Sequence, residues 1–438
     1  MASAKLTRTN GTATTGNIYT WSAWVKRGLS STQETLVRTR TDDNNYSRIR
    51  FDDDGTLVFE DRISSSTVTN LVSNAQHRDL SAWYHVVVRV DYTQATAGDR
   101  ARIYVNGSEV TYSSTTRQSQ SGSSYFNSAN SHDLGHYNSN NYFNGSMTHV
   151  HFTDGYSYAP STFGETDSTS GIWKPKTAPS VTYGNNGYFL KMENSGAMGT
   201  DSSGNSNNFT VSGTLTQNVD TPSNNFATWN PLTYHFSNQW QANTNGNTTA
   251  NGGSGSAWKT ILTTLGVSSG KYYFEAKLIS SGTNCIIGAV DINDARQNSS
   301  SAWYIGQSST GQGYQNNGAS ANGGASYGAT YANNDIIGVA MDLDNSKIYF
   351  HKNGTYQNSG DPTSGATGTG AISLTANTTY AFAVSSYAGT VWNANFGNGY
   401  FGTTQVASAG TAPSEGGIFE YDCPSGYQAL CTKGINSF

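Results

Sequence analysis

The chain has 438 residues, of which 12% are charged and 35% are apolar, so uncharged polar residues and glycine make up most of the remainder. This length exceeds what one hydrophobic core usually supports, and the composition suits strands and turns better than helices. The net charge of -5 provides no positive field for nucleic acid, and no apolar run has the length of a membrane span or a signal peptide. We therefore expect a two-domain, all-β protein that binds no nucleic acid, has no membrane span and is not exported through a signal peptide.

The first half of the chain repeats the alternation of apolar and polar residues that is typical of half-buried strands. Segments 36–40 and 47–51 alternate about a turn at 41–45 and predict a hairpin. Its outer face carries four arginines: Arg38, Arg40, Arg48 and Arg50. Further strands are expected at 83–91, 102–110, 145–152 and 187–192. Many short strands between turns favour a sandwich or a jelly roll.

From about residue 195 to residue 232, Asn, Ser, Gly and Pro dominate, and this composition predicts the connection between two domains. Phe209, Phe226 and Trp229 indicate that the connection packs onto a domain. Strand patterns resume at 271–278, 285–290, 335–344, 347–354, 380–384 and 389–397. Segment 306–331 consists almost only of small or polar residues and Tyr, which predicts a long functional or disordered loop.

Five segments of the second half resemble the SPRY domain and follow the family's order. They are 270–276, 286–290, 335–344, 348–354 and 392–397. SPRY domains are bent β-sandwiches that bind partners through loops. The resemblance therefore implies a binding module without catalytic activity.

The first half resembles laminin-G-like, concanavalin A-like jelly rolls, through segments 21–27, 83–88, 103–107 and 142–155. Segments 163–167, 171–176, 201–205 and 220–225 are similar to structural proteins of tailed bacteriophages, especially marine, cyanophage-like ones. These resemblances imply a virion structural protein with two tandem antiparallel β-sandwiches. The expected order is a concanavalin A-like sandwich at 1–196, a connector at 197–233, a SPRY-like sandwich at 234–402 and a C-terminal extension at 403–438.

Concanavalin A-like folds include glucanases, which place two carboxylates about 5 Å apart. The nearest pattern, Glu165 and Asp167, has no second Glu and lies in a turn-rich stretch. No nucleophile motif accompanies it, so we expect no enzyme activity, no catalytic residue and no cofactor. Acidic residues 52–54 favour a turn over a Ca²⁺ site, and His149 and His151 favour a polar strand face over a metal pair. Cys423 and Cys431 are expected to be reduced, with a disulfide between them as the alternative.

Tyrosines among Gly, Ser and Asn offer faces on which sugar rings stack, while amides bind their hydroxyls. One such group is Tyr125, Tyr137 and Tyr142, and the other is Tyr314, Tyr327 and Tyr331. The arginine forks of the predicted hairpin suit carboxylates and phosphates. The alternative is a solvated face that Asp42, Asp43 and Glu60 neutralise.

We expect a tail fibre or tail-associated adhesin that binds host-surface polysaccharide or protein through its loops. The alternatives are a capsid decoration protein that makes subunit contacts and, as a minor one, a glycan hydrolase. The expected partners are other virion proteins and further copies of the chain, and the symmetry of phage appendages suggests a trimer or a higher ring. The expected location is the virion, assembled in the cytoplasm of a bacterial host.

Overall fold

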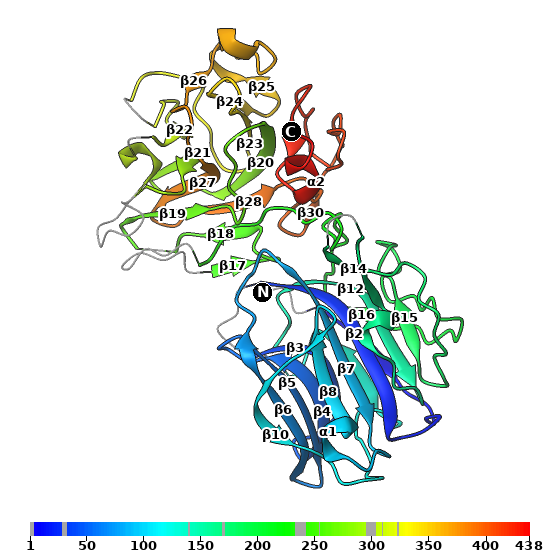
Figure 1. Ribbon diagram of the computed structural model, residues 1–438. Helices are drawn as coiled ribbons and strands as arrows, with labels where there is room; N and C mark the ends of the chain where they lie inside the picture. The colour runs from blue at the N-terminus through cyan, green and yellow to red at the C-terminus, as the bar shows by residue number, and fades with distance from the viewer. Residues whose placement is uncertain are drawn as a thin grey trace. The chain divides into compact units, whose positions relative to one another are not determined.

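The computed structural model describes residues 4–28, 33–138, 141–168, 171–232, 242–253, 255–294, 304–308, 310–321 and 324–438. By its internal contacts the chain divides into two units, Met1–Gln217 and Asn218–Phe438. Each unit consists almost entirely of strands in antiparallel sheets (Figure 1). The predicted fold class, two tandem antiparallel β-sandwiches, is confirmed. Residue 234, where the SPRY-like domain was predicted to begin, lies outside the described residues.

The first unit contains an eight-stranded and a six-stranded sheet (Figure 1). The eight-stranded sheet runs, in spatial order, β10 (Tyr112–Thr116), β6 (Ser66–Gln76), β5 (Thr56–Ile63), β4 (Asn45–Phe51), β3 (Glu34–Asp42), β11 (Ser131–Leu134), β1 (Lys5–Thr9) and β16 (Thr210–Ser212). The six-stranded sheet runs β15 (Tyr188–Leu190), β12 (Gly145–Asp154), β2 (Ile18–Arg27), β7 (Trp83–Asp91), β8 (Ala101–Val105) and β9 (Ser108–Glu109). Helix α1 (Ala97–Arg100) and a small sheet of β13 (Gly164–Thr166) and β14 (Trp173–Pro175) complete the described elements of this unit.

The core of the first unit lies between its two large sheets. Ile49 and Phe59 project into it from the eight-stranded sheet, and Trp21, Val88 and Phe152 from the six-stranded sheet. All five side chains are fully buried. Because strand side chains alternate, the residues between Ile49 and Phe51 or beside Phe59 must face away from this core. The candidate site described below is built from such residues.

The second unit contains a nine-stranded and a four-stranded sheet. The nine-stranded sheet runs β17 (Ala242–Thr244), β18 (Thr249–Asn251), β28 (Val391–Asn395), β20 (Lys271–Ser280), β23 (Ile336–Asp342), β24 (Lys347–Lys352) and β25 (Thr355–Tyr356), with β26 (Ile372–Ser373) paired to β24 and β31 (Gln428–Ala429) paired to β20. The four-stranded sheet runs β19 (Trp258–Leu262), β27 (Tyr380–Tyr387), β21 (Asn284–Asp291) and β22 (Gln312–Gln315). A pair of short strands, β29 (Tyr400–Phe401) and β30 (Thr404–Gln405), and helix α2 (Thr432–Ile435) follow.

Each half of the predicted connector packs onto its own unit. Strand β16 pairs with β1, and the Phe209 ring meets the buried Tyr188 ring edge-on, with centroids 4.7 Å apart. Phe226 and Trp229 are buried in clusters of the second unit. The aromatic residues of this segment therefore anchor it.

The predicted C-terminal extension forms an additional layer on the second unit. Phe419 and Tyr427 pack against Tyr273 and Tyr349 in one buried cluster. Strand β31 adds to β20 in parallel. Cys423 and Cys431 lie in this layer as separate buried thiols. Among the described residues, no helix combines the length and the apolar character that crossing a membrane requires.

Candidate functional site

The outer face of the eight-stranded sheet carries a polar residue from every strand along one cross-strand line. The register places these residues side by side: Thr210, Thr7, Asp133, Arg38, Arg48, Glu60, Asn70 and Thr116. Their strand neighbours, such as Leu6, Val37 and Leu71, are buried on the inner face. Alternation alone thus places polar side chains along one line of the outer face of the sheet, and Asp133 and Arg48 at its centre are buried. We call this line the polar row.

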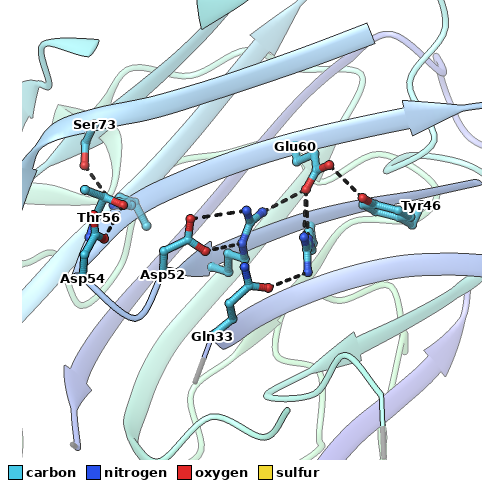
Figure 2. A network of polar contacts seen from close by, with 10 residues as sticks. Gln33, Tyr46, Asp52, Asp54, Thr56, Glu60 and Ser73 are labelled. Carbon is cyan, nitrogen blue, oxygen red and sulfur yellow. Dashed lines mark hydrogen bonds and ion pairs between the residues drawn. The ribbon is translucent and has the colours of Figure 1, made fainter. Parts of the chain in front are cut away.

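The predicted arginine hairpin forms the centre of the polar row, where Arg38 and Arg48 lie directly opposite each other. Glu60 Oε2 accepts hydrogen bonds from Arg48 Nε at 3.1 Å and from Arg50 Nη1 at 2.9 Å, and Glu60 Oε1 accepts one from the Tyr46 hydroxyl at 2.7 Å (Figure 2). Arg50 Nε also donates to Asp52 at 2.6 Å. Every guanidinium nitrogen of Arg48 and Arg50 has an acceptor within the chain.

The remaining two arginines of the hairpin are also paired. Arg38 donates to Asp133 at 2.6 Å, and Arg40 pairs with the exposed Asp43. Although burial alone would raise it, the hydrogen bond and charge of Arg38 hold the pKa of Asp133 well below its usual value. Burial is likewise outweighed at Glu60, whose pKa is lowered by Arg48 and Tyr46. The acids that neutralise this face are therefore Glu60, Asp133, Asp52 and Asp43, of which Glu60 and Asp43 were expected from the sequence.

Tyr137 lies over the arginines. Its ring centroid is 4.5 Å from the guanidinium carbon of Arg48, 5.6 Å from that of Arg40 and 5.8 Å from that of Arg38. A half-buried aromatic ring on a bed of fixed cations is held by cation–π attraction. The arginines thus position an aromatic side chain, in addition to any direct contact with a ligand.

The other two tyrosines of the first group lie close by. Tyr142 packs on His136, centroid to centroid 4.6 Å, and His136 bonds to Asp133. The Tyr125 hydroxyl contacts Thr41 Oγ1 at 2.6 Å, at the end of β3. Both rings are half-buried. The structure therefore brings Tyr125, Tyr137 and Tyr142 to the region of the four arginines.

The second group of tyrosines does not form a surface, and the prediction that Tyr314, Tyr327 and Tyr331 are available for contact is wrong. All three are buried in the core of the second unit. Part of the segment that was expected to be a loop forms strand β22, which pairs with β21. The three rings of this segment point into the core. Tyr331 donates to the Tyr314 carbonyl at 2.9 Å, and Tyr314 donates to the Ala329 carbonyl. The free-energy cost of burying a tyrosine is small when its hydroxyl donates to a backbone carbonyl.

Four of the acidic positions weighed for metal binding or hydrolysis are engaged within the chain: Asp52, Asp54, Glu165 and Asp167. Asp54 accepts from Thr56 N at 2.8 Å, in the turn before β5. Lys174 lies 3.7 Å from Glu165 and 2.9 Å from Asp167. No group of three or more metal-type side chains comes together in the part of the chain that the structure describes.

The two histidines both pack against Phe189, with the His149 ring centroid 6.0 Å from that of Phe189. The strand bulges between Thr148 and His151, and His149 has a positive φ of 48°. His151 is buried and stacks on Phe189 at 3.9 Å. The predicted polar face at these two positions is therefore wrong for His151.

Sequence reasoning missed a buried contact between a serine and a histidine in the first unit. Ser22 Oγ lies 2.8 Å from His85 Nε2, and the Trp173 indole N–H donates to His85 Nδ1 at 3.0 Å. Because an indole only donates, His85 Nδ1 must be unprotonated and Nε2 must carry the proton. Nε2 then donates to Ser22 and has no lone pair with which to activate it. The separation of 63 residues left no sequence signal for this pair.

Two family models match the chain. Residues 2–159 match a laminin-G model of the concanavalin A-like lectin/glucanases superfamily. Residues 271–398 match the SPRY domain. Both predicted domain resemblances are confirmed. Among curated protein sequences, none matches this chain.

Solved structures show likeness to single parts of the chain. The SPRY domain of human HERC1 is 15% identical, with 33% of this chain and 86% of that one covered and a TM-score of 0.26. A heptameric SAP-like pentraxin from Limulus polyphemus is 14% identical, with 42% and 90% covered and a TM-score of 0.30. A protein from Bacteroides ovatus described as carbohydrate binding is 14% identical, with 48% and 56% covered and a TM-score of 0.30.

Proposed function

We propose that this chain is a structural protein of a bacteriophage virion, a tail fibre or tail-associated adhesin, whose first unit binds a host-surface glycan. The family matches to a lectin-type fold and to a SPRY domain support a binding role. The similarity of the connecting segments to phage structural proteins supports the virion assignment. The observation that carries the proposal is the polar row with Tyr137 held above its arginines.

The chemistry of this face suits a sugar chain. The ring of Tyr137 offers an apolar surface for the C–H face of a pyranose. Asn70 and Thr116 continue the polar row toward β10 with uncharged hydrogen-bonding groups. Since Arg48 and Arg50 are saturated by Glu60, Asp52 and Gln33, the ligand needs no negative charge of its own.

The proposal is tested by glycan-array and host-cell binding of the full chain and of Tyr137→Ala. We expect binding that weakens about tenfold or more in the variant, because truncation of a central aromatic contact removes a large share of the binding energy. Tyr156→Ala is the matched control, since Tyr156 is exposed at the end of β12 and away from the polar row. Unchanged binding by Tyr137→Ala would contradict the site. Ordered placement over the whole capsid of an intact particle would contradict the adhesin role.

A further inference from the structure

A second aromatic cluster lies in the second unit, at one end of the four-stranded sheet. Trp258 of β19, Tyr387 of β27 and Asn284 of β21 form one cross-strand row. The Trp258 ring stacks on Tyr304, with centroids 4.3 Å apart and planes 21° apart, and meets Tyr387 at 5.7 Å and 62°. All four side chains are half-buried. We call them the Trp258 cluster.

The polar atoms of the Trp258 cluster lack partners in the part of the chain that the structure describes. Among the described residues, no hydrogen bond involves the side-chain amide of Asn284, the hydroxyls of Tyr304 and Tyr387 or the indole N–H of Trp258. Elsewhere in this unit, the aromatic hydroxyls of Tyr331 and Tyr380 reach backbone carbonyls. The Trp258 cluster therefore keeps donors and acceptors that the described residues leave open to a ligand.

Among the described residues, the neighbours of the Trp258 cluster on its face of the sheet are uncharged. In the next cross-strand row, the hydroxyls of Thr260 and Ser385 bond to each other at 2.8 Å, and Ser385 also accepts from Ile305 N. Lys259 points to the opposite face of β19 and donates to the Gly252 carbonyl. A ligand that meets these side chains finds aromatic faces and neutral hydrogen-bonding groups.

We propose that the Trp258 cluster is a binding subsite for one pyranose ring of a neutral polysaccharide. The part of the stacked Trp258–Tyr304 pair that is not buried receives the C–H face of the sugar. The Asn284 amide and the two tyrosine hydroxyls exchange hydrogen bonds with its ring substituents, because each can donate and accept. The inference rests on the second unit alone and does not depend on the site proposed for the first unit.

Affinity electrophoresis in gels that contain dextran, mannan or galactan tests the proposal. The full chain carrying Tyr137→Ala serves as the parent, so that binding by the first unit does not mask the result. We expect retardation in at least one neutral gel, and a dissociation constant about tenfold or more higher after the further change Trp258→Ala. Asn284→Ala is the second variant, because this half-buried side chain at the start of β21 holds no other residue and its loss leaves the fold intact.

The control is Tyr156→Ala, which removes an exposed aromatic ring from the first unit and should leave the retardation unchanged. Absence of retardation in every neutral gel would overturn the proposal. So would equal retardation of the parent and both variants, retardation by polygalacturonate alone, or binding only to a deglycosylated host-surface protein.

Discussion

Glu60 is the residue on which the polar row depends, since one carboxylate oxygen accepts from two arginines. We expect Glu60→Gln to lower the free energy of unfolding of the first unit by about 2 to 3 kcal/mol, because it leaves the buried Arg48 and Arg50 without their shared anion. Urea unfolding measures the change. Asp43→Asn is the control: Asp43 is exposed, and its pair with Arg40 should contribute less than about 1 kcal/mol.

The same variant gives a pH test. The pKa of Glu60 is lowered in the folded chain. Its contribution to the free energy of unfolding is therefore present above the ordinary pKa near 4.5 and is lost as the pH falls through the folded pKa. The stability difference between parent and Glu60→Gln should therefore be full at pH 7 and shrink below pH 4.5. A difference that grows on acidification would contradict the ion-pair network.

At single residues, the sequence predicted which side chains share a face but not what they bond to. Alternation placed Arg38, Arg40, Arg48 and Arg50 together, as the register now shows. The partner of Arg38, Asp133, is 95 residues away and is brought close only by the insertion of β11 between β1 and β3. Local patterns contain no information on such a pairing.

The C-terminal layer is attached to β20 through one buried carboxylate. Glu275 accepts the backbone N–H groups of Glu420 and Tyr421, both at 2.8 Å, and the hydroxyl of Tyr273 at 2.9 Å. Tyr273 in turn contacts His351 Nε2 at 2.6 Å. Burial raises the pKa of Glu275 to about 7, despite these hydrogen bonds.

This raised pKa predicts the direction in which pH acts on the layer. The folded pKa of Glu275 lies above the ordinary value of 4.5. The stability that Glu275 gives to the C-terminal layer is therefore full below pH 4.5 and is lost as the pH rises through about 7. Hydrogen-exchange protection factors at Glu420 and Tyr421 should therefore fall by up to about a hundredfold between pH 4.5 and 7, and stay level above it.

Glu275→Gln isolates this effect, because the variant keeps His351 and the other titratable neighbours, Tyr273 and Glu420. In the variant, the protection factors at Glu420 and Tyr421 should not show the fall between pH 4.5 and 7 that ionisation of Glu275 causes. If the parent and the variant show the same pH profile, or if protection rises with pH only in the parent, the role assigned to Glu275 is wrong.

At the level of elements, strands with strict alternation were predictable and strands made of small residues were not. The pattern at 335–354 predicts the hairpin that β23 and β24 form. Strand β22, Gln312–Gln315, has no such pattern, because Gly313 is there to let the backbone approach Ile287, and a Cβ would lie 2.9 Å from the Ile287 carbonyl oxygen. Composition alone made this segment resemble a loop, and the tyrosines beside it were misplaced for that reason.

For the whole molecule, the sequence predicted two sandwiches and a boundary region, but it gave no reason to expect a third layer in the second unit. Segment 403–412 is mostly exposed, and the large apolar residues that are buried after it are Phe419, Tyr427 and Leu430. These residues are buried against strands that lie about 150 residues earlier in the chain, such as β20. Docking of this kind depends on tertiary contacts and leaves no local periodicity.

The layer should nevertheless be required for the second unit to fold. Deleting 403–438 uncovers Tyr273, Ala340 and Tyr349 and leaves Glu275 without its two amide donors. Burial of large side chains contributes about 1.5 to 3 kcal/mol each, so the loss of several is comparable with the usual stability of a domain. Cys285, which is fully buried in this unit, becomes accessible to a thiol reagent when the unit unfolds.

We expect a thiol reagent to label Cys285 rapidly in the truncated chain and slowly in the parent, as measured by peptide mass spectrometry. Phe438→Ala is the control, because this half-exposed terminal ring packs on Tyr272 and over Gly270 and its loss should leave Cys285 protected. Equal protection of Cys285 in the truncated chain would show that the two sheets of the second unit are stable without the third layer.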